Sequence, residues 1–209
     1  MDTLALRLAA AGGRIDTLPA SQLVAAGFTL LQRSAPLVRM LAGGRSALLL
    51  PPGPAAVVAL AASDGRGAVM LPLGAPPSEL AALCAASDVG AVFTTDALRP
   101  SVPASLGVVL LDQAPRAALV CTPEGREQTV DLGSHVGLTI EGETDLPGRE
   151  EECLILPAAP PQRLTHRAVL ELDGLAARID PTRADAALVT ELLIPLLAGR
   201  SLASPPSSR

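Results

Sequence analysis

The sequence predicts an α/β fold: a mostly parallel sheet with flanking helices, plus a small antiparallel β meander. Three short, continuously apolar segments at residues 47–50, 68–71 and 91–94 begin at intervals of roughly 20 residues, about the length of a minimal strand–helix–strand repeat. Continuous apolar strands joined by helices are typical of a parallel sheet that is covered on both faces. The apolar segments beyond residue 107 are instead separated by polar turns, which predicts the meander.

Helical patterns lie before and between these strands. Residues 18–41 carry an apolar stripe at helical spacing, and Pro36 is expected to kink or split that helix. Residues 55–62 and 78–86 are expected to form the connecting helices, the second with Ser78 as its N-cap. These helices would cover the sheet.

The second half of the chain is expected to finish the same domain. A fourth strand is predicted at 108–111, meander strands at 117–121, 128–132 and 136–140, a return to the main sheet at 153–156, and helices at 165–178 and 185–197. Residues 1–200 are therefore interpreted as one domain, and the Ser/Pro-rich residues 201–209 as a disordered tail.

Composition excludes several classes of protein. The net charge of −5 argues against a nucleic-acid surface, which needs clustered basic residues. The three cysteines are odd in number and far apart, which indicates buried thiols in a reducing compartment. The sequence shows no signal peptide pattern and no apolar run of the roughly 18 residues that a membrane span needs. We therefore expect a cytoplasmic protein with no membrane span and no nucleic-acid partner.

The most informative stretch is the junction after the apolar strand at 153–156. Residues 164–170, Leu-Thr-His-Arg-Ala-Val-Leu, are expected to begin a helix, and only Pro-Ala-Ala-Pro-Pro-Gln-Arg at 157–163 lies between. A phosphate-binding loop needs inward-pointing backbone N–H groups, which glycine favours, and a cation. This connection has no Gly, Ser, Thr or Lys, and its prolines carry no N–H.

The order of strand, short connection and Thr-His-Arg-Ala-Val-Leu resembles the AMP-forming adenylating enzymes: acyl-CoA synthetases, fatty acyl-AMP ligases and peptide-synthetase adenylation domains. Residues 47–94 look like the opening of such an enzyme, and residues 185–199 look like a shortened form of the segment after its phosphate loop. In that family the connection is a loop of the type TSGTTGxPKG, and the cofactors are ATP and Mg²⁺. The family also uses two lysines, whereas this chain has none.

The resemblance implies the N-terminal subdomain only, truncated and with its phosphate loop deleted. We therefore expect a degenerate, non-catalytic relative of AMP-dependent acyl-CoA synthetases and ligases that needs no cofactor. The alternatives are an interaction or regulatory module that docks on a full-length homologue or a carrier-protein system, half of a split adenylating enzyme, or a gene remnant without a selected role.

Four residues near the junction are the first to test for retained nucleotide binding: Arg163, Thr165, His166 and Arg167. Both arginines could meet an anion, aided by the helix N-terminus near Thr165. The structural alternative is that Thr165 caps the helix while His166 and Arg167 face solvent.

No residue is assigned a catalytic or metal-binding role. A Ser-His-Asp arrangement would have to use His135 or His166, and no GxSxG motif supports one. The acidic residues Glu141, Glu143 and Asp145 lack the spacing of a calcium loop.

The missing second subdomain predicts a partner. In the resembled enzymes this part packs against another large subdomain, so the apolar faces of helices 165–178 and 185–197 would lose their cover. We expect self-association or a protein partner there. The competing expectation is that these helices fold back and close the core.

Overall fold

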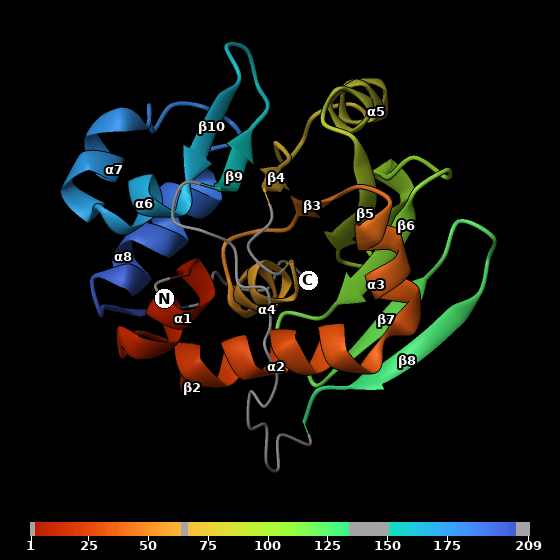
Figure 1. Ribbon diagram of the computed structural model, residues 1–209, viewed down its shortest axis with the longest axis horizontal. Coiled ribbons are helices and arrows are strands. Elements are labelled where there is room, and N and C mark those ends of the chain that lie inside the picture. The colour runs from red at the N-terminus through yellow and green to blue at the C-terminus, as the bar shows by residue number, and fades with distance from the viewer. Residues whose placement is uncertain (1–2, 64–66, 134–150, 204–209) are drawn as a thin grey trace.

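The computed structural model describes residues 3–63, 67–133 and 151–203. Its centre is an eight-stranded sheet with strand order β10-β9-β4-β3-β5-β6-β7-β8 (Figure 1). The parallel strands are β3 (Arg45–Leu49), β4 (Ala68–Met70), β5 (Val89–Thr94), β6 (Gly107–Leu111) and β9 (Glu152–Leu156). Antiparallel strands extend both edges: β7 (Ala117–Cys121), β8 (Glu127–Asp131) and β10 (Gln162–Thr165).

This topology confirms the predicted fold class. Strand β9 lies beside β4, with Ala68 paired to Leu154, although the two strands are far apart in the sequence. The antiparallel strands β7 and β8 continue the main sheet from β6 instead of forming a separate unit. The predicted strand at 136–140 lies outside the described residues.

Helices cover the two faces of the sheet. Helix α4 (Pro54–Ala62) is buried along its whole length, and helix α2 (Ala20–Arg33) packs against it. Gly27 allows the close approach, because a Cβ at that position would lie 2.5 Å from the Cβ of Ala61. Helix α5 (Pro77–Ala86) contributes Leu80 and Cys84 to a second apolar cluster, built with side chains of β3, β4 and β5.

Two helix boundaries differ in detail from the prediction. The stretch at 18–41 is split as expected, but the break lies at Ser34, whose Oγ accepts the Leu37 N–H at the start of helix α3 (Ala35–Ala42). The prediction that Ser78 caps α5 is wrong: the N-cap is Pro76, since Pro77 already occupies the first helical turn.

The region after the junction differs more. Leu164 belongs to β10, so the helix begins at His166, later than the sequence predicted. The helix expected at 165–178 is broken at Glu171 into α6 (His166–Leu170) and α7 (Leu172–Arg178). The helix expected at 185–197 is a π-helix, η2 (Leu188–Leu193), followed by α8 (Ile194–Leu197). Pro195 has no N–H to donate to the carbonyl of residue 191, which accords with the wider turns before it.

A small three-stranded sheet joins the two ends of the described chain. It contains β1 (Arg14–Ile15), β2 (Leu18–Pro19) and β11 (Ser201–Leu202), and β11 runs parallel to β1. The sequence predicted a disordered tail from residue 201. Its first two residues, Ser201 and Leu202, form a strand because they pair with the backbone of β1. The remaining short helices are α1 (Leu4–Ala10) and the 3-10 turn η1 (Arg99–Ser101).

The helices after the junction are covered from within the chain. Val169, Leu175, Leu192 and Leu196 are almost fully buried in the same apolar cluster as α1 and the sheet. The expectation that these helices expose their apolar faces is therefore wrong, and the competing expectation that they close the core is correct.

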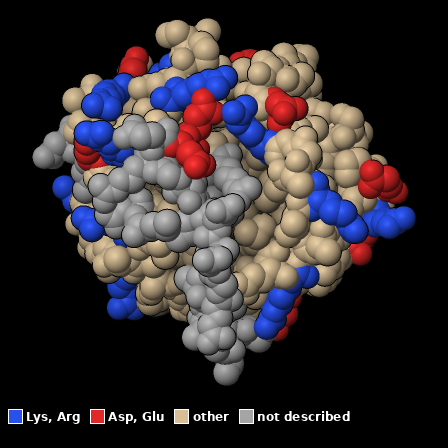
Figure 2. Space-filling view, viewed as in Figure 1, with Lys and Arg blue, Asp and Glu red and all other residues tan. Residues whose placement is uncertain are grey.

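Charged side chains of both signs are interspersed on the face shown in Figure 2. The surface in that view carries no continuous basic area of the kind that a nucleic acid would need. Within the described residues, no helix is both long enough and apolar enough to cross a membrane.

Candidate functional site

The junction singled out by the sequence is a β-hairpin. Strands β9 and β10 pair antiparallel, with Leu156 opposite Gln162, and residues 157–161 form the loop between them. The sequence predicted a strand, a connection and a helix, and missed β10. The side chains of β10 alternate in the manner of an edge strand: Leu164 is buried, whereas Arg163 is exposed.

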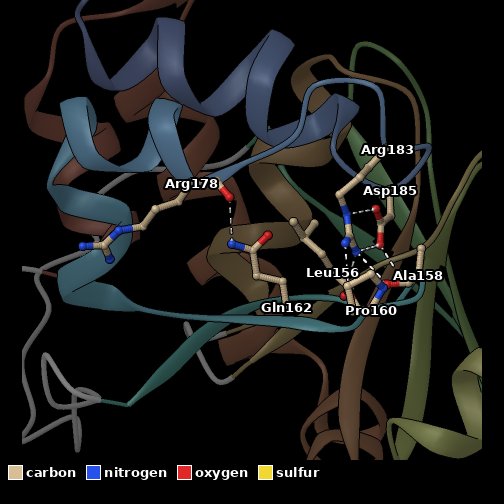
Figure 3. Close-up of polar contacts among 7 residues, drawn as sticks. All are labelled: Leu156, Ala158, Pro160, Gln162, Arg178, Arg183 and Asp185. Carbon is tan, nitrogen blue, oxygen red and sulfur yellow. Dashed lines mark hydrogen bonds and ion pairs between the residues drawn. The ribbon is translucent and has the colours of Figure 1, made fainter.

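The side chain of Arg183 occupies the inside of this loop (Figure 3). Its Nη1 donates to the carbonyl oxygen of Pro160 at 2.8 Å. Its Nη2 donates to the carbonyl oxygens of Ala158 at 2.8 Å and Leu156 at 3.3 Å. The Arg183 side chain is only 14% exposed, so these bonds form largely away from water. The loop therefore turns its backbone acceptors inward.

Asp185 completes the arrangement. Its carboxylate holds Arg183 through two contacts of 3.0 Å, one to Nε and one to Nη2, and its side chain is fully buried. The oxygen Oδ2 also accepts the backbone N–H of Ala158 at 2.8 Å. We call Arg183, Asp185 and hairpin residues 156–160 the arginine plug. A bidentate guanidinium–carboxylate pair of this kind is both strong and geometrically specific.

The plug leaves the loop few groups with which to bind an anion. Pro157, Pro160 and Pro161 have no N–H, and the N–H of Ala158 is bonded to Asp185. At the far end of the loop, Gln162 Nε2 donates to the carbonyl oxygen of Arg178 at 3.1 Å, which ties the hairpin to α7.

Two of the predicted site residues, Thr165 and His166, form hydrogen bonds within the fold. Thr165 is the N-cap of α6, since its Oγ1 accepts the Ala168 N–H at 3.2 Å, as the structural alternative expected. His166 is completely buried, and its Nδ1 accepts the N–H of Leu4 at 3.2 Å. The expectation that His166 faces solvent is therefore wrong, because α1 packs over it.

The two predicted arginines form ion pairs elsewhere. Arg163 contacts Glu152 at 2.6 Å, and the same carboxylate contacts Arg45 at 2.8 Å. Arg167 is exposed and contacts Glu171 at 3.3 Å. The cation that bonds to the carbonyl oxygens of the loop is therefore Arg183, and not one of the two predicted arginines.

The cysteines are unsuited to nucleophilic chemistry. All three are buried, and burial raises the pKa of the Cys84 thiol to about 11. Burial also raises the pKa of Cys121 and, more strongly, that of Cys153. Thiols with raised pKa values hold little of the reactive thiolate at neutral pH. Within the described part of the chain, no three His, Cys, Asp or Glu residues are grouped to hold a metal ion.

Sequence reasoning missed both charged residues of the plug. Arg183 and Asp185 lie more than 20 residues beyond the loop, and the sequence pattern marks Asp185 only as the start of a predicted helix. The available signal was the Asp-Pro-Thr-Arg-Ala-Asp stretch at 180–185, where Asp180 Oδ1 accepts the N–H of Thr182 in a local turn.

Comparison with models of protein families gave no match, and comparison with curated proteins gave none either. Solved structures do match. The N-terminal domain of FACL13 from Mycobacterium tuberculosis aligns with a TM-score of 0.63 and 15% identity, covering 100% of this chain and 58% of that one. A benzoate CoA ligase from Burkholderia xenovorans LB400 aligns with a TM-score of 0.61 and 17% identity, covering 100% of this chain and 46% of the ligase.

A peptide synthetase shows the same similarity. NpsA-ThdA, an artificially fused adenylation–PCP di-domain from Klebsiella oxytoca, aligns with a TM-score of 0.63 and 17% identity, covering 100% of this chain and 39% of the fusion. The chain thus spans less than two thirds of each of these three structures. In all three cases the aligned region covers 100% of this chain. The protein has the fold of the N-terminal part of the AMP-forming ligases.

Proposed function

We propose that this chain is a non-catalytic relative of the AMP-forming ligases that does not use ATP at the β9–β10 loop. The observation that carries the proposal is the arginine plug. The loop directs three carbonyl oxygens inward, onto the guanidinium of Arg183. A triphosphate needs the opposite polarity, with N–H groups and cations directed at its oxygens.

Two further features support the proposal. In the loop, the N–H of Ala158 already donates to Asp185 at 2.8 Å. The sequence also contains no lysine, so no compact ammonium group is present to neutralise phosphate charge. Bringing ATP to this loop would place its negative charge beside the buried Asp185 carboxylate.

The test is a calorimetric titration of the chain with ATP and magnesium, with a full-length AMP-forming ligase as the positive control. We expect no saturable heat below the millimolar range, and no exchange of pyrophosphate into ATP when acyl or amino acids are added. A micromolar dissociation constant for the chain alone would overturn the proposal.

We propose further that the chain acts as an interaction or regulatory module, although its closed core does not itself need a partner. The strands and helices pack into two apolar clusters without a second subdomain. We propose that its partner is a protein of the same system, either a full-length homologue or its carrier protein, and that the chain acts in the cytoplasm. Light scattering on the purified chain, alone and mixed with such a homologue, tests this role. We expect a mixed complex; two species that stay separate at tens of micromolar would contradict it.

A further inference from the structure

The arginine plug has the polarity of a cation site. Three carbonyl oxygens and one carboxylate surround a single guanidinium inside the hairpin (Figure 3). The oxygens come from two separate parts of the chain: residues 156–160 of the hairpin, and Asp185 before the π-helix. We propose that this loop is a guanidinium-binding site whose occupant is Arg183 of the same chain.

The inference rests on the proposed function, and it adds the chemical class of ligand that the loop accepts. An anion site emptied of its ligand would direct donors inward. This loop directs acceptors inward, and its Asp185 carboxylate is fully buried. A buried carboxylate needs a cation beside it, because an unpaired charge is costly in the interior.

The arrangement of the oxygens selects a planar fork. The carboxylate of Asp185 meets Nε and Nη2 along one edge of the guanidinium, each at 3.0 Å. The carbonyl oxygens of Pro160 and Ala158 meet Nη1 and Nη2, each at 2.8 Å. A lysine ammonium is a point charge with three donors and cannot match this edge-on pattern. The site is therefore specific for guanidinium over ammonium cations.

Contacts other than those of Arg183 also hold the hairpin in place. Ala158 N–H bonds to Asp185 Oδ2, which links the loop to residue 185 without the guanidinium. Gln162 Nε2 bonds to the Arg178 carbonyl oxygen, and the pairing of β9 with β10 fixes both ends of the loop. Removing the Arg183 side chain should thus leave a preformed, negatively charged hollow that a small guanidinium compound can enter.

The experiment uses the full chain with Arg183→Ala and methylguanidinium chloride as the probe. We expect methylguanidinium to raise the melting temperature of this variant in a saturable way, with half-saturation at about 1–10 mM, the range of a small ligand with few atoms. Tetramethylammonium chloride at equal ionic strength should give no such increase. Wild-type protein should not respond, because its site is filled.

Two further variants sharpen the result. Arg178→Ala is the matched control. The Arg178 side chain is exposed and points away from the loop in Figure 3, and Gln162 contacts only the backbone carbonyl oxygen of this residue, which the substitution keeps. It should behave like wild type. The double variant with Arg183→Ala and Asp185→Asn should lose the response to methylguanidinium, because the buried charge is gone.

The outcomes separate this inference from the proposed function. No saturable response of Arg183→Ala, or an equal response to both cations, overturns the guanidinium site. Tight ATP binding gained by Arg183→Ala also overturns it, because Arg183 would then cover an anion site. Tight ATP binding by the wild-type chain contradicts the proposed function instead. If Arg183→Ala does not fold alone, its refolding yield is measured in methylguanidinium and in tetramethylammonium. A higher yield in methylguanidinium supports the guanidinium site, and equal yields overturn it.

Discussion

The centre of the sheet and the loop of the β9–β10 hairpin are stabilised by different forces. At the centre, α4 and the strands beside it are almost fully buried and nearly all apolar. At the loop, the contacts are polar, and one buried ion pair makes most of them. The centre is therefore tolerant of exchange among apolar residues of similar volume, whereas the loop depends on two particular side chains.

The largest loss of stability should come from a substitution at the centre of the sheet. Phe93 in β5 is completely buried, and Phe93→Ala would leave a cavity in the main apolar cluster. We expect a loss of about 3–5 kcal/mol in the free energy of unfolding, measured by urea denaturation. Val38→Ala is the control, since Val38 is 46% exposed and its loss should cost about 0.5 kcal/mol or less. Equal losses for the two variants would contradict the packing described.

The second-largest loss of stability should come from a substitution in the arginine plug. Asp185→Ala removes the carboxylate that pairs with Arg183 and the acceptor of the Ala158 N–H, which should cost about 2–4 kcal/mol in the free energy of unfolding. Asp185→Asn should cost less, because an amide oxygen can still accept from Ala158. Glu171→Ala removes only an exposed ion pair with Arg167 and should cost about 0.5 kcal/mol or less. An Asp185→Ala variant as stable as Glu171→Ala would show that the plug contributes nothing.

The contact between α2 and α4 gives a smaller effect. In Gly27→Ala the new methyl group would lie 2.5 Å from the Cβ of Ala61, so the two helices must move apart. We expect a loss of about 1–3 kcal/mol in thermal or chemical denaturation. Gly43→Ala is the matched control, because its nearest neighbour would lie at 3.7 Å. A neutral Gly27→Ala would mean that the helices are less closely packed.

The smallest effect is a dependence on alkaline pH. Burial raises the pKa of Cys84 from 9.0 to about 11, so the unfolded chain loses this proton at lower pH than the folded chain. The unfolded state then binds fewer protons, and stability must fall as the pH rises from about 9 towards 11. Cys84→Ala should flatten part of that fall in urea titrations at several pH values. An unchanged slope would show that the folded thiol ionises normally.

The same contrast explains what the sequence could predict. The strands at the centre are local apolar runs such as Ala-Leu-Leu at 47–49, so their positions and their shared sheet follow from the pattern alone. The lack of phosphate-loop residues at 157–163 was equally visible. The arginine plug could not be predicted from the sequence. Arg183 and Asp185 bond to Ala158 from 25 and 27 residues away, and no periodicity marks a single ion pair.

The buried position of His166 shows the same limit. The Thr-His-Arg stretch reads as the polar start of a helix, and Thr165 does cap α6. The His166 imidazole accepts the backbone N–H of Leu4, 162 residues away, so its burial depends on how α1 packs. Tertiary contacts of this kind leave no trace in the local sequence.

The most direct test of the account is the amide of Ala158. If Asp185 holds this N–H inside the arginine plug, its hydrogen exchange should be slow in the wild-type chain. Its NMR resonance should also stay unchanged when ATP and magnesium are added to millimolar concentration. Fast exchange, together with a saturable shift of the Ala158 resonance on adding ATP, would show that the loop is open to phosphate and would contradict the account.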